Sequence, residues 1–272
     1  MSLNSRAILE WARQTGTRDP SGTMAELAES LRDAYFSRNK RAIRKPPYLA
    51  EKMAPLRRII GFVVQNIDES ARLEVGKNGF LCVLSYGEHR GVRRNFSIAH
   101  ELGHTEFYDI EKWPPTPLIS PHQMGTEEVE RLCHRFAECL LIPQRDLPSV
   151  QKRIAEELSF DTILRTAHEY QVSLETLVRR LDGAGGLVAR DRFVAILRPT
   201  FLGGTRGVFV SALAGPSGEM LRLPTNDISL STDTSLIMLR FGGQNVTCDL
   251  RTRHFGSSEG GYKVALGYLE TS

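Results

Sequence analysis

Residues 96–104 read FSIAHELGH, and this stretch governs the interpretation of the whole chain. On an α-helix, side chains four positions apart project from one face, so His100 and His104 can bind a single metal ion through their ring nitrogens. Glu101 follows the first histidine, close enough to act on a water molecule at that ion without being a ligand itself. The stretch therefore predicts a helix that carries half of a metal site.

The neighbouring residues favour this interpretation over two surface histidines. The same helix carries apolar side chains that require burial, and burying two unpaired imidazoles is costly; these side chains are Phe96, Ile98, Ala99 and Leu102. Gly103 weakens a helix by up to ~1 kcal/mol, which indicates that another segment packs close to it. The alternative is chance, because H-E-x-x-H is expected in roughly one chain in a hundred of this size.

A second helix is predicted over residues 126–142, TEEVERLCHRFAECLLI, where apolar residues recur at helical spacing up to Pro143. A catalytic zinc site uses three protein ligands and leaves the fourth position to water. At ~100° per residue, Glu130 is the only carboxylate of this helix at the edge of its apolar stripe. Glu130 is the predicted third ligand, with a surface salt bridge as the alternative. His134, one turn later, is expected to orient a ligand or to be one.

The composition excludes several classes of protein. The chain has 272 residues, a formal charge of +3 and 41% hydrophobic residues, as in an ordinary globular protein. No apolar run approaches the ~20 residues of a membrane span, and the charged start MSLNSRAILEWARQ is unlike a secretory signal. The expectation is a cytoplasmic protein without a membrane partner. Its cysteines are expected to be reduced core residues: Cys82, Cys133, Cys139 and Cys248.

The rest of the pattern predicts an α+β fold. Residues 4–36 and 49–60 are expected to be helical, and Asn78-Gly79 predicts the turn of a β-hairpin. Asn95 is a candidate N-cap of the central helix, which is expected to run to about Tyr108. A loop with four prolines follows at 109–125.

The second half of the chain changes character. Two or three helices are expected over 148–182, with a helix-turn-helix outline at the end. Short strand-like runs separated by Gly, Pro, Asn and Asp begin near residue 187. We therefore predict a mostly helical domain with a small sheet at 1–147, a helix-turn-helix-like segment at 148–184 and a β-rich domain at 187–272.

Two stretches of the chain resemble the ImmA/IrrE family of metallopeptidases. The family patterns R-x-x-F-T-x-A-H-E-x-G-H and E-x-x-A-N-x-F-A-x-x-L-L-x-P are matched around residues 93–104 and 130–143. Departures are Ser97 for threonine, Cys133 for alanine and His134 for asparagine. The order of a peptidase-like domain, a helix-turn-helix-like segment and a third domain is similar to the IrrE branch, in which the third domain is GAF-like and would be sensory.

This resemblance implies a zincin-like, gluzincin-type peptidase that uses zinc or manganese. It implies that His100, His104 and Glu130 bind the metal and that Glu101 is the catalytic base. It also implies a protein substrate, a helix-turn-helix repressor whose cleavage releases stress-response or mobile-element genes.

The alternative hypothesis is a non-enzymatic regulator that binds DNA through residues 160–182 and uses the metal site as a structural element or a sensor. DNA-recognition helices usually place several basic or amide side chains on one face. The stretch SLETLVRRL offers only Arg179 and Arg180, at its far end. Core scaffolding is therefore the preferred role for this segment.

Overall fold

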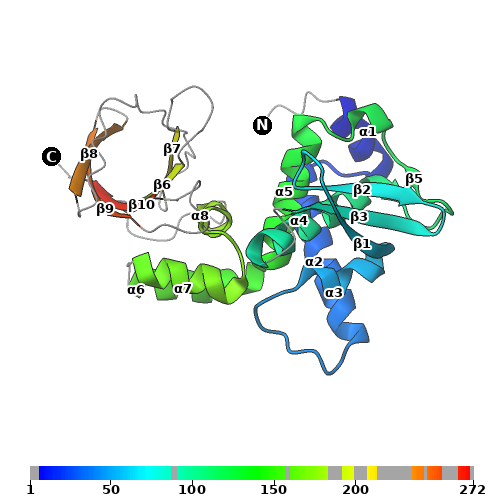
Figure 1. Ribbon diagram of the computed structural model, residues 1–272, viewed down its shortest axis with the longest axis horizontal. Helices are drawn as coiled ribbons and strands as arrows, with labels where there is room; N and C mark the ends of the chain where they lie inside the picture. Colours follow the sequence, from blue (N-terminus) through cyan, green and yellow to red (C-terminus); the bar gives the residue numbers. More distant parts are fainter. Residues whose placement is uncertain are drawn as a thin grey trace. The chain divides into compact units, whose positions relative to one another are not determined.

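The computed structural model describes residues 6–86, 91–156 and 160–182, and five strand segments beyond them: 192–198, 207–212, 235–241, 244–252 and 263–269. The chain forms two compact units (Figure 1). The first comprises Met1–Gln144 and His168–Ser173, and the second comprises Arg145–Ala167 and Leu174–Ser272.

The first unit is mostly helical and contains a small sheet, which makes it α+β as predicted. Its helices are α1 (Arg6–Thr15), α2 (Pro20–Arg38), α3 (Ala50–Met53), α4 (Gly91–His104) and α5 (Glu127–Leu141). Its 3₁₀ turns are η1 (Ala54–Arg57), η3 (Thr105–Phe107) and η4 (Pro121–Gln123). Its strands are β1 (Ile59–Gln65), β2 (Ala71–Gly76), β3 (Gly79–Ser85), β4 (Tyr108–Asp109) and β5 (Thr116–Pro117).

The three-stranded sheet has the order β1-β3-β2, with β2 antiparallel and β1 parallel to β3. The predicted hairpin is confirmed, although its two turn residues are Lys77 and Asn78, and Gly79 already pairs with Gly76. Gly79 has a φ of 145°, and a Cβ there would lie 2.4 Å from the carbonyl oxygen of Arg58. Only glycine fits this close approach between the hairpin and the segment before β1.

The prediction of a helix over 49–60 is confirmed for its first part and wrong for its end. The helical residues end at Arg57, after which Arg58 takes a left-handed conformation and the chain enters β1. The apolar run of β1 pairs with β3, a long-range contact that helical periodicity does not reveal.

Helix α5 lies in the middle of the helical layer, packed against both α2 and α4. The helix predicted from its apolar stripe is confirmed, and the stripe is buried: Val129, Leu132, Cys133, Phe136, Ala137, Leu140 and Leu141. Three glutamates in its first turn complement the positive end of the helix dipole. At its other end, Arg32 of α2 donates hydrogen bonds to the carbonyl oxygens of Cys139 and Leu140.

Helix α4 begins earlier than predicted. Asn95 is not its N-cap but a buried residue inside it, where its side chain accepts a hydrogen bond from Ala50 N and donates one to Tyr48 O. Asparagine suits an N-cap because its short side chain forms hydrogen bonds with backbone groups of its own helix. Here the backbone groups belong to Tyr48 and to the first residue of α3. The helix ends at His104, and the 3₁₀ turn η3 takes the chain to the expected limit near Tyr108.

The second unit includes α6 (Leu147–Glu156), most of α7 (Phe160–Tyr170) and α8 (Leu174–Asp182). Its strands are β6 (Arg192–Arg198), β7 (Gly207–Ala212), β8 (Ser235–Phe241), β9 (Gln244–Thr252) and β10 (Lys263–Leu269). They form an antiparallel sheet in the order β7-β6-β10-β9-β8. The strand-like run EMLRLP at 219–224 lies outside the described residues. Within the described chain, no helix combines the length and the apolar character that crossing a bilayer requires.

Candidate metal centre

The two histidines of α4 and the glutamate of α5 come together on the same side of the helix pair. His100 Nε2 lies 3.0 Å from Glu130 Oε2 and 3.1 Å from His104 Nε2. His104 Nε2 lies 3.3 Å from Glu130 Oε1. The polar atoms of these three side chains, which we call the histidine cluster, thus form a small triangle.

The size of this triangle suits a zinc ion. With zinc–ligand bonds of ~2.0–2.1 Å, neighbouring ligand atoms of a tetrahedral site lie about 3.3 Å apart. The three observed separations of 3.0, 3.1 and 3.3 Å are close to that value. Two imidazole nitrogens and one carboxylate oxygen are also ligand types that zinc accepts. The residues present therefore fit the metal.

The three groups of the cluster shift one another's pKa values. Burial lowers the pKa of His100 to about 4. Burial also lowers the pKa of His104, but Cys133, Glu130 and Glu101 outweigh it and the net pKa lies well above the usual value. Burial raises the pKa of Glu130, while hydrogen bonds from His100 and His104 bring it well below its usual range. Of the two histidines, His104 is therefore the one that keeps a proton at neutral pH, and Glu130 stays ionised beside it.

Close packing of the two helices positions these groups. A Cβ at Gly103 would lie 3.0 Å from Cys133 Cα and 3.3 Å from Cys133 O. The prediction that a segment packs close to Gly103 is confirmed, and the segment is α5. Because residue 103 has no side chain, α5 approaches α4 closely enough for Glu130 to reach both histidines.

Glu101 points away from solvent beside this cluster, with 3% of its surface exposed. Burial raises its pKa to about 7, with a further increase from Glu130 and an opposing effect of His104. A carboxyl group with a pKa near neutrality can both accept and donate a proton there, which is the property that a general base and acid needs.

His134 is exposed and lies against the histidine cluster from one side. Its ring centroid lies 4.5 Å from that of His100, and its Nδ1 donates a hydrogen bond to Glu130 O at 2.9 Å. His100, Glu130 and His134 each bring one potential ligand atom within 4.8 Å of the other two. His134 therefore contacts both a ring and a backbone carbonyl of the cluster.

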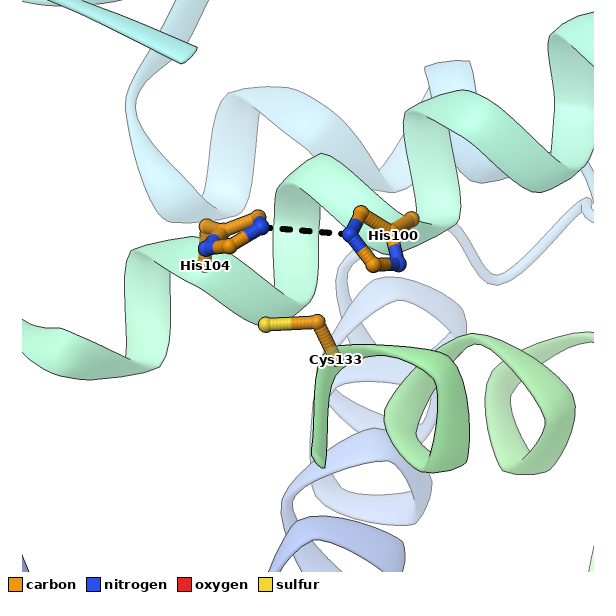
Figure 2. Close-up of side chains that lie close together, drawn as sticks. All are labelled: His100, His104 and Cys133. Carbon is orange, nitrogen blue, oxygen red and sulfur yellow. Dashed lines mark hydrogen bonds between the residues drawn. The ribbon is translucent and has the colours of Figure 1, made fainter. Parts of the chain in front are cut away.

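Cys133 was predicted only as a reduced residue of the hydrophobic core, but it also lies beside the histidine cluster. His100, His104 and Cys133 also bring one potential ligand atom each within 4.8 Å of one another. Figure 2 shows the sulfur of Cys133 reaching from α5 toward His104. One signal was available, because Cys133 follows Glu130 by three positions and so lies on the neighbouring turn of the same helix.

One protein-family model matches part of the chain. Residues 72–182 match the peptidase family M78, described as an IrrE N-terminal-like domain. No curated protein sequence matches the chain significantly. Among solved structures, a Mycobacterium tuberculosis transcriptional regulator is similar, with a TM-score of 0.51 and 14% sequence identity; the match covers 95% of this chain and 79% of that one. At this identity the likeness concerns the fold.

Proposed function

The chain belongs to the ImmA/IrrE family of peptidases through residues 72–182, and on this premise we propose that it is a zinc-dependent endopeptidase. Its substrate would be a helix-turn-helix repressor, whose cleavage releases stress-response or mobile-element genes. The observation that carries the proposal is the triangle of His100, His104 and Glu130, with separations of 3.0–3.3 Å. Manganese is the alternative metal.

In this proposal His100, His104 and Glu130 hold the ion. A bound zinc ion polarises a peptide carbonyl and makes water a nucleophile at neutral pH. The apolar side of α4 keeps the two imidazoles in position, since Ile98, Ala99 and Leu102 are all at most 1% exposed. His134 is the positioning residue in this scheme: its hydrogen bond to Glu130 O fixes its ring against His100.

Glu101 is the proposed catalytic residue. Its carboxylate accepts a proton from the attacking water and then donates that proton to the nitrogen of the leaving amine. The enclosure of Glu101 supports this role, because burial raises the proton affinity of its carboxylate. The proton thus moves from water to one carboxylate oxygen and on to the new amino terminus.

The remaining parts of the chain are proposed to serve regulation. We assign the peptidase domain to 1–147, the helix-turn-helix-like segment to 148–184 and a sensory, GAF-like domain to 187–272. Regulation of transcription is supported by the name of the similar structure, a transcriptional regulator.

The experiment that tests this function is cleavage of candidate repressors. The zinc-loaded protein is incubated with helix-turn-helix regulators encoded beside it, and fragments are identified by mass spectrometry. The expected result is a single cut in one regulator, with at least a hundredfold slower cleavage by Glu101→Gln. If no regulator is cut with zinc or manganese, or if Glu101→Gln cuts as fast as wild type, the peptidase proposal fails.

The second candidate is a DNA-binding regulator that does not cleave protein. The helix-turn-helix outline of α7 and α8 favours it, as does the name of the similar structure. Against it, Arg180 is only 1% exposed, so that of the two arginines of α8 only Arg179 is exposed. A salt-dependent gel shift with specific DNA would support this function.

A further inference from the structure

Cys133 brings a thiol to a place where the family pattern has alanine. It belongs to α5, one turn after Glu130, and is fully buried. In a metal-free core, a cysteine behaves as a small apolar residue. Its surroundings here are not apolar: the side chain lies against the rings of α4 that we propose as metal ligands (Figure 2).

The distances allow the sulfur to join these ligands. Potential ligand atoms of His100, His104 and Cys133 lie within 4.8 Å of one another. In a tetrahedral zinc site with Zn–S of ~2.3 Å and Zn–N of ~2.0–2.1 Å, sulfur and nitrogen lie about 3.6 Å apart. Each separation therefore has to shrink by no more than about 1.2 Å, an amount within reach of a χ1 adjustment.

The backbone brings the sulfur into this range. The absence of a side chain at Gly103 lets the backbone of Cys133 come within 3.0 Å of the ideal Cβ position. His100 Nδ1 is buried and has no hydrogen-bond partner within the described part of the chain. If His100 binds a metal ion through Nε2, the proton of the neutral ring lies on Nδ1. The position of Nδ1 is therefore compatible with metal binding through Nε2.

We propose that Cys133 is a fourth protein ligand of the metal. This inference rests on the proposed function, because it concerns the ion that His100, His104 and Glu130 hold. On binding, the thiol loses its proton to solvent and one metal–sulfur bond forms. The resting site is then closed by two nitrogens, one oxygen and one sulfur, and the sulfur occupies the position that water needs.

Two properties follow from a sulfur ligand. A thiolate favours zinc and cobalt over manganese, which prefers carboxylate and water ligands. The coordination is also that of a closed site while the sulfur is bound, so the proposed peptidase activity requires the sulfur to leave the metal. A hydrogen bond between Cys133 and His104, with the sulfur outside the coordination sphere, would have neither effect.

Cobalt substitution tests the proposal. The full-length protein is loaded with Co²⁺ and its absorption is recorded in the near ultraviolet, where thiolate-to-cobalt charge transfer absorbs. The expected result is one charge-transfer band per bound cobalt in wild type and its loss in Cys133→Ala. The matched control is Cys139→Ala, which removes another buried thiol of α5 and is expected to keep the band.

The ratio of zinc affinity to manganese affinity provides the second readout. We expect it to fall about tenfold or more in Cys133→Ala and to stay unchanged in Cys139→Ala. Circular dichroism of each variant shows whether it is folded, and Cys133→Ser replaces Cys133→Ala if the latter is not.

The outcomes separate this inference from the proposed function. If cobalt binds to wild type without a charge-transfer band, or if Cys133→Ala keeps the band, Cys133 is not a ligand while the metal site stands. If cobalt does not bind to wild type at all, the proposed function fails with it.

Discussion

Two polar clusters draw on neighbouring residues at the end of α4 and in the 3₁₀ turn η3 that follows, and they differ in how their charges are balanced. The histidine cluster consists of His100, His104 and Glu130. The second, which we call the arginine cluster, consists of Arg57, Thr105 and Glu106. Arg57 lies 2.9 Å from Glu106 Oε2 and donates hydrogen bonds to Thr105 Oγ1 and Thr105 O at 3.0 and 2.9 Å.

The arginine cluster is complete without a ligand, because it brings its own cation to the buried carboxylate. The histidine cluster brings two ring nitrogens within 3.1 Å of each other and a carboxylate that faces both. A shared proton can join these groups, and a bound metal ion would join them in the function that we propose. The comparison shows a difference in composition: the arginine cluster contains a permanent cation of its own, and the histidine cluster, which we propose as the metal site, contains none.

The largest effect on the metal-free protein is expected from Arg57→Ala. Burial raises the pKa of Glu106, with Arg57 opposing, and loss of the arginine leaves that carboxyl group without its partner. We expect a loss of about 3–5 kcal/mol in unfolding free energy, measured by urea denaturation. Zinc affinity should not change.

The control for that variant is Arg72→Ala, because Arg72 pairs with Glu74 at 2.8 Å on the surface, where the two side chains are 45% and 43% exposed. Its expected cost is about 0–1 kcal/mol. Equal losses in the two variants would mean that the arginine cluster does not stabilise the fold as described.

Zinc is expected to stabilise the fold only through the histidine cluster. At a free zinc concentration a thousand times the dissociation constant, the unfolding free energy of wild type should rise by about 4.1 kcal/mol. In His104→Ala, we expect zinc to bind at least a hundredfold more weakly. Under the same conditions zinc would then raise the unfolding free energy of this variant by about 1.4 kcal/mol or less. Thermal unfolding with and without zinc measures both values. A full zinc effect in His104→Ala would contradict the assignment of this ligand.

The buried carboxyl group of Glu101 predicts a pH effect on the metal-free protein. Its pKa is about 7 in the folded state against 4.5 as a reference. The folded chain therefore binds a proton that the unfolded chain releases between these values, and stability falls as pH rises through this window. Glu101→Gln removes the effect, so at pH 8 it should be more stable than wild type by up to about 3 kcal/mol.

Below pH 4 the two proteins should be equally stable, and zinc should reduce the difference at pH 8 because a nearby cation favours the carboxylate. Denaturation at several pH values is the measurement. A difference that does not depend on pH would show that Glu101 titrates normally.

Gly103→Ala tests the close contact between α4 and α5. Its Cβ would meet the backbone of Cys133 at 3.0 Å. Overpacking costs about 1–3 kcal/mol, against a gain of up to ~1 kcal/mol in helix propensity. We expect a net loss of up to about 2 kcal/mol together with weaker zinc binding.

Gly125→Ala is the matched control, since nothing lies within 4 Å of the Cβ position there, and its effect should stay within about 0.5 kcal/mol. If Gly103→Ala behaves like Gly125→Ala, the spacing of the two helices does not depend on this glycine.

Local patterns predicted much of this architecture. The helix 126–142, the hairpin and the packing at Gly103 follow from periodicity, turn chemistry and the helix-weakening effect of glycine, all of which act within a few residues. Helical geometry also selected Glu130 as the carboxylate at the edge of the apolar stripe, and its Oε2 lies 3.0 Å from His100 Nε2.

What the sequence did not predict depends on contacts between distant segments. Asn95 has the short amide of an N-cap, but its partners are Ala50 and Tyr48, more than forty positions away. The parallel pairing of β1 with β3 joins residues about twenty positions apart. The prediction of Cys133 as a reduced core residue is confirmed, but its nearness to His104 depends on how two helices pack.

The central claim is that His100, His104 and Glu130 hold one divalent ion while Glu101 remains free to move protons. The most direct measurement is the zinc affinity of wild type, Glu130→Ala and Glu101→Gln, determined by competition with a chelating indicator. We predict one tight site in wild type and in Glu101→Gln, and at least a hundredfold weaker binding in Glu130→Ala. Unchanged affinity in Glu130→Ala, or loss of zinc in Glu101→Gln, would contradict the account.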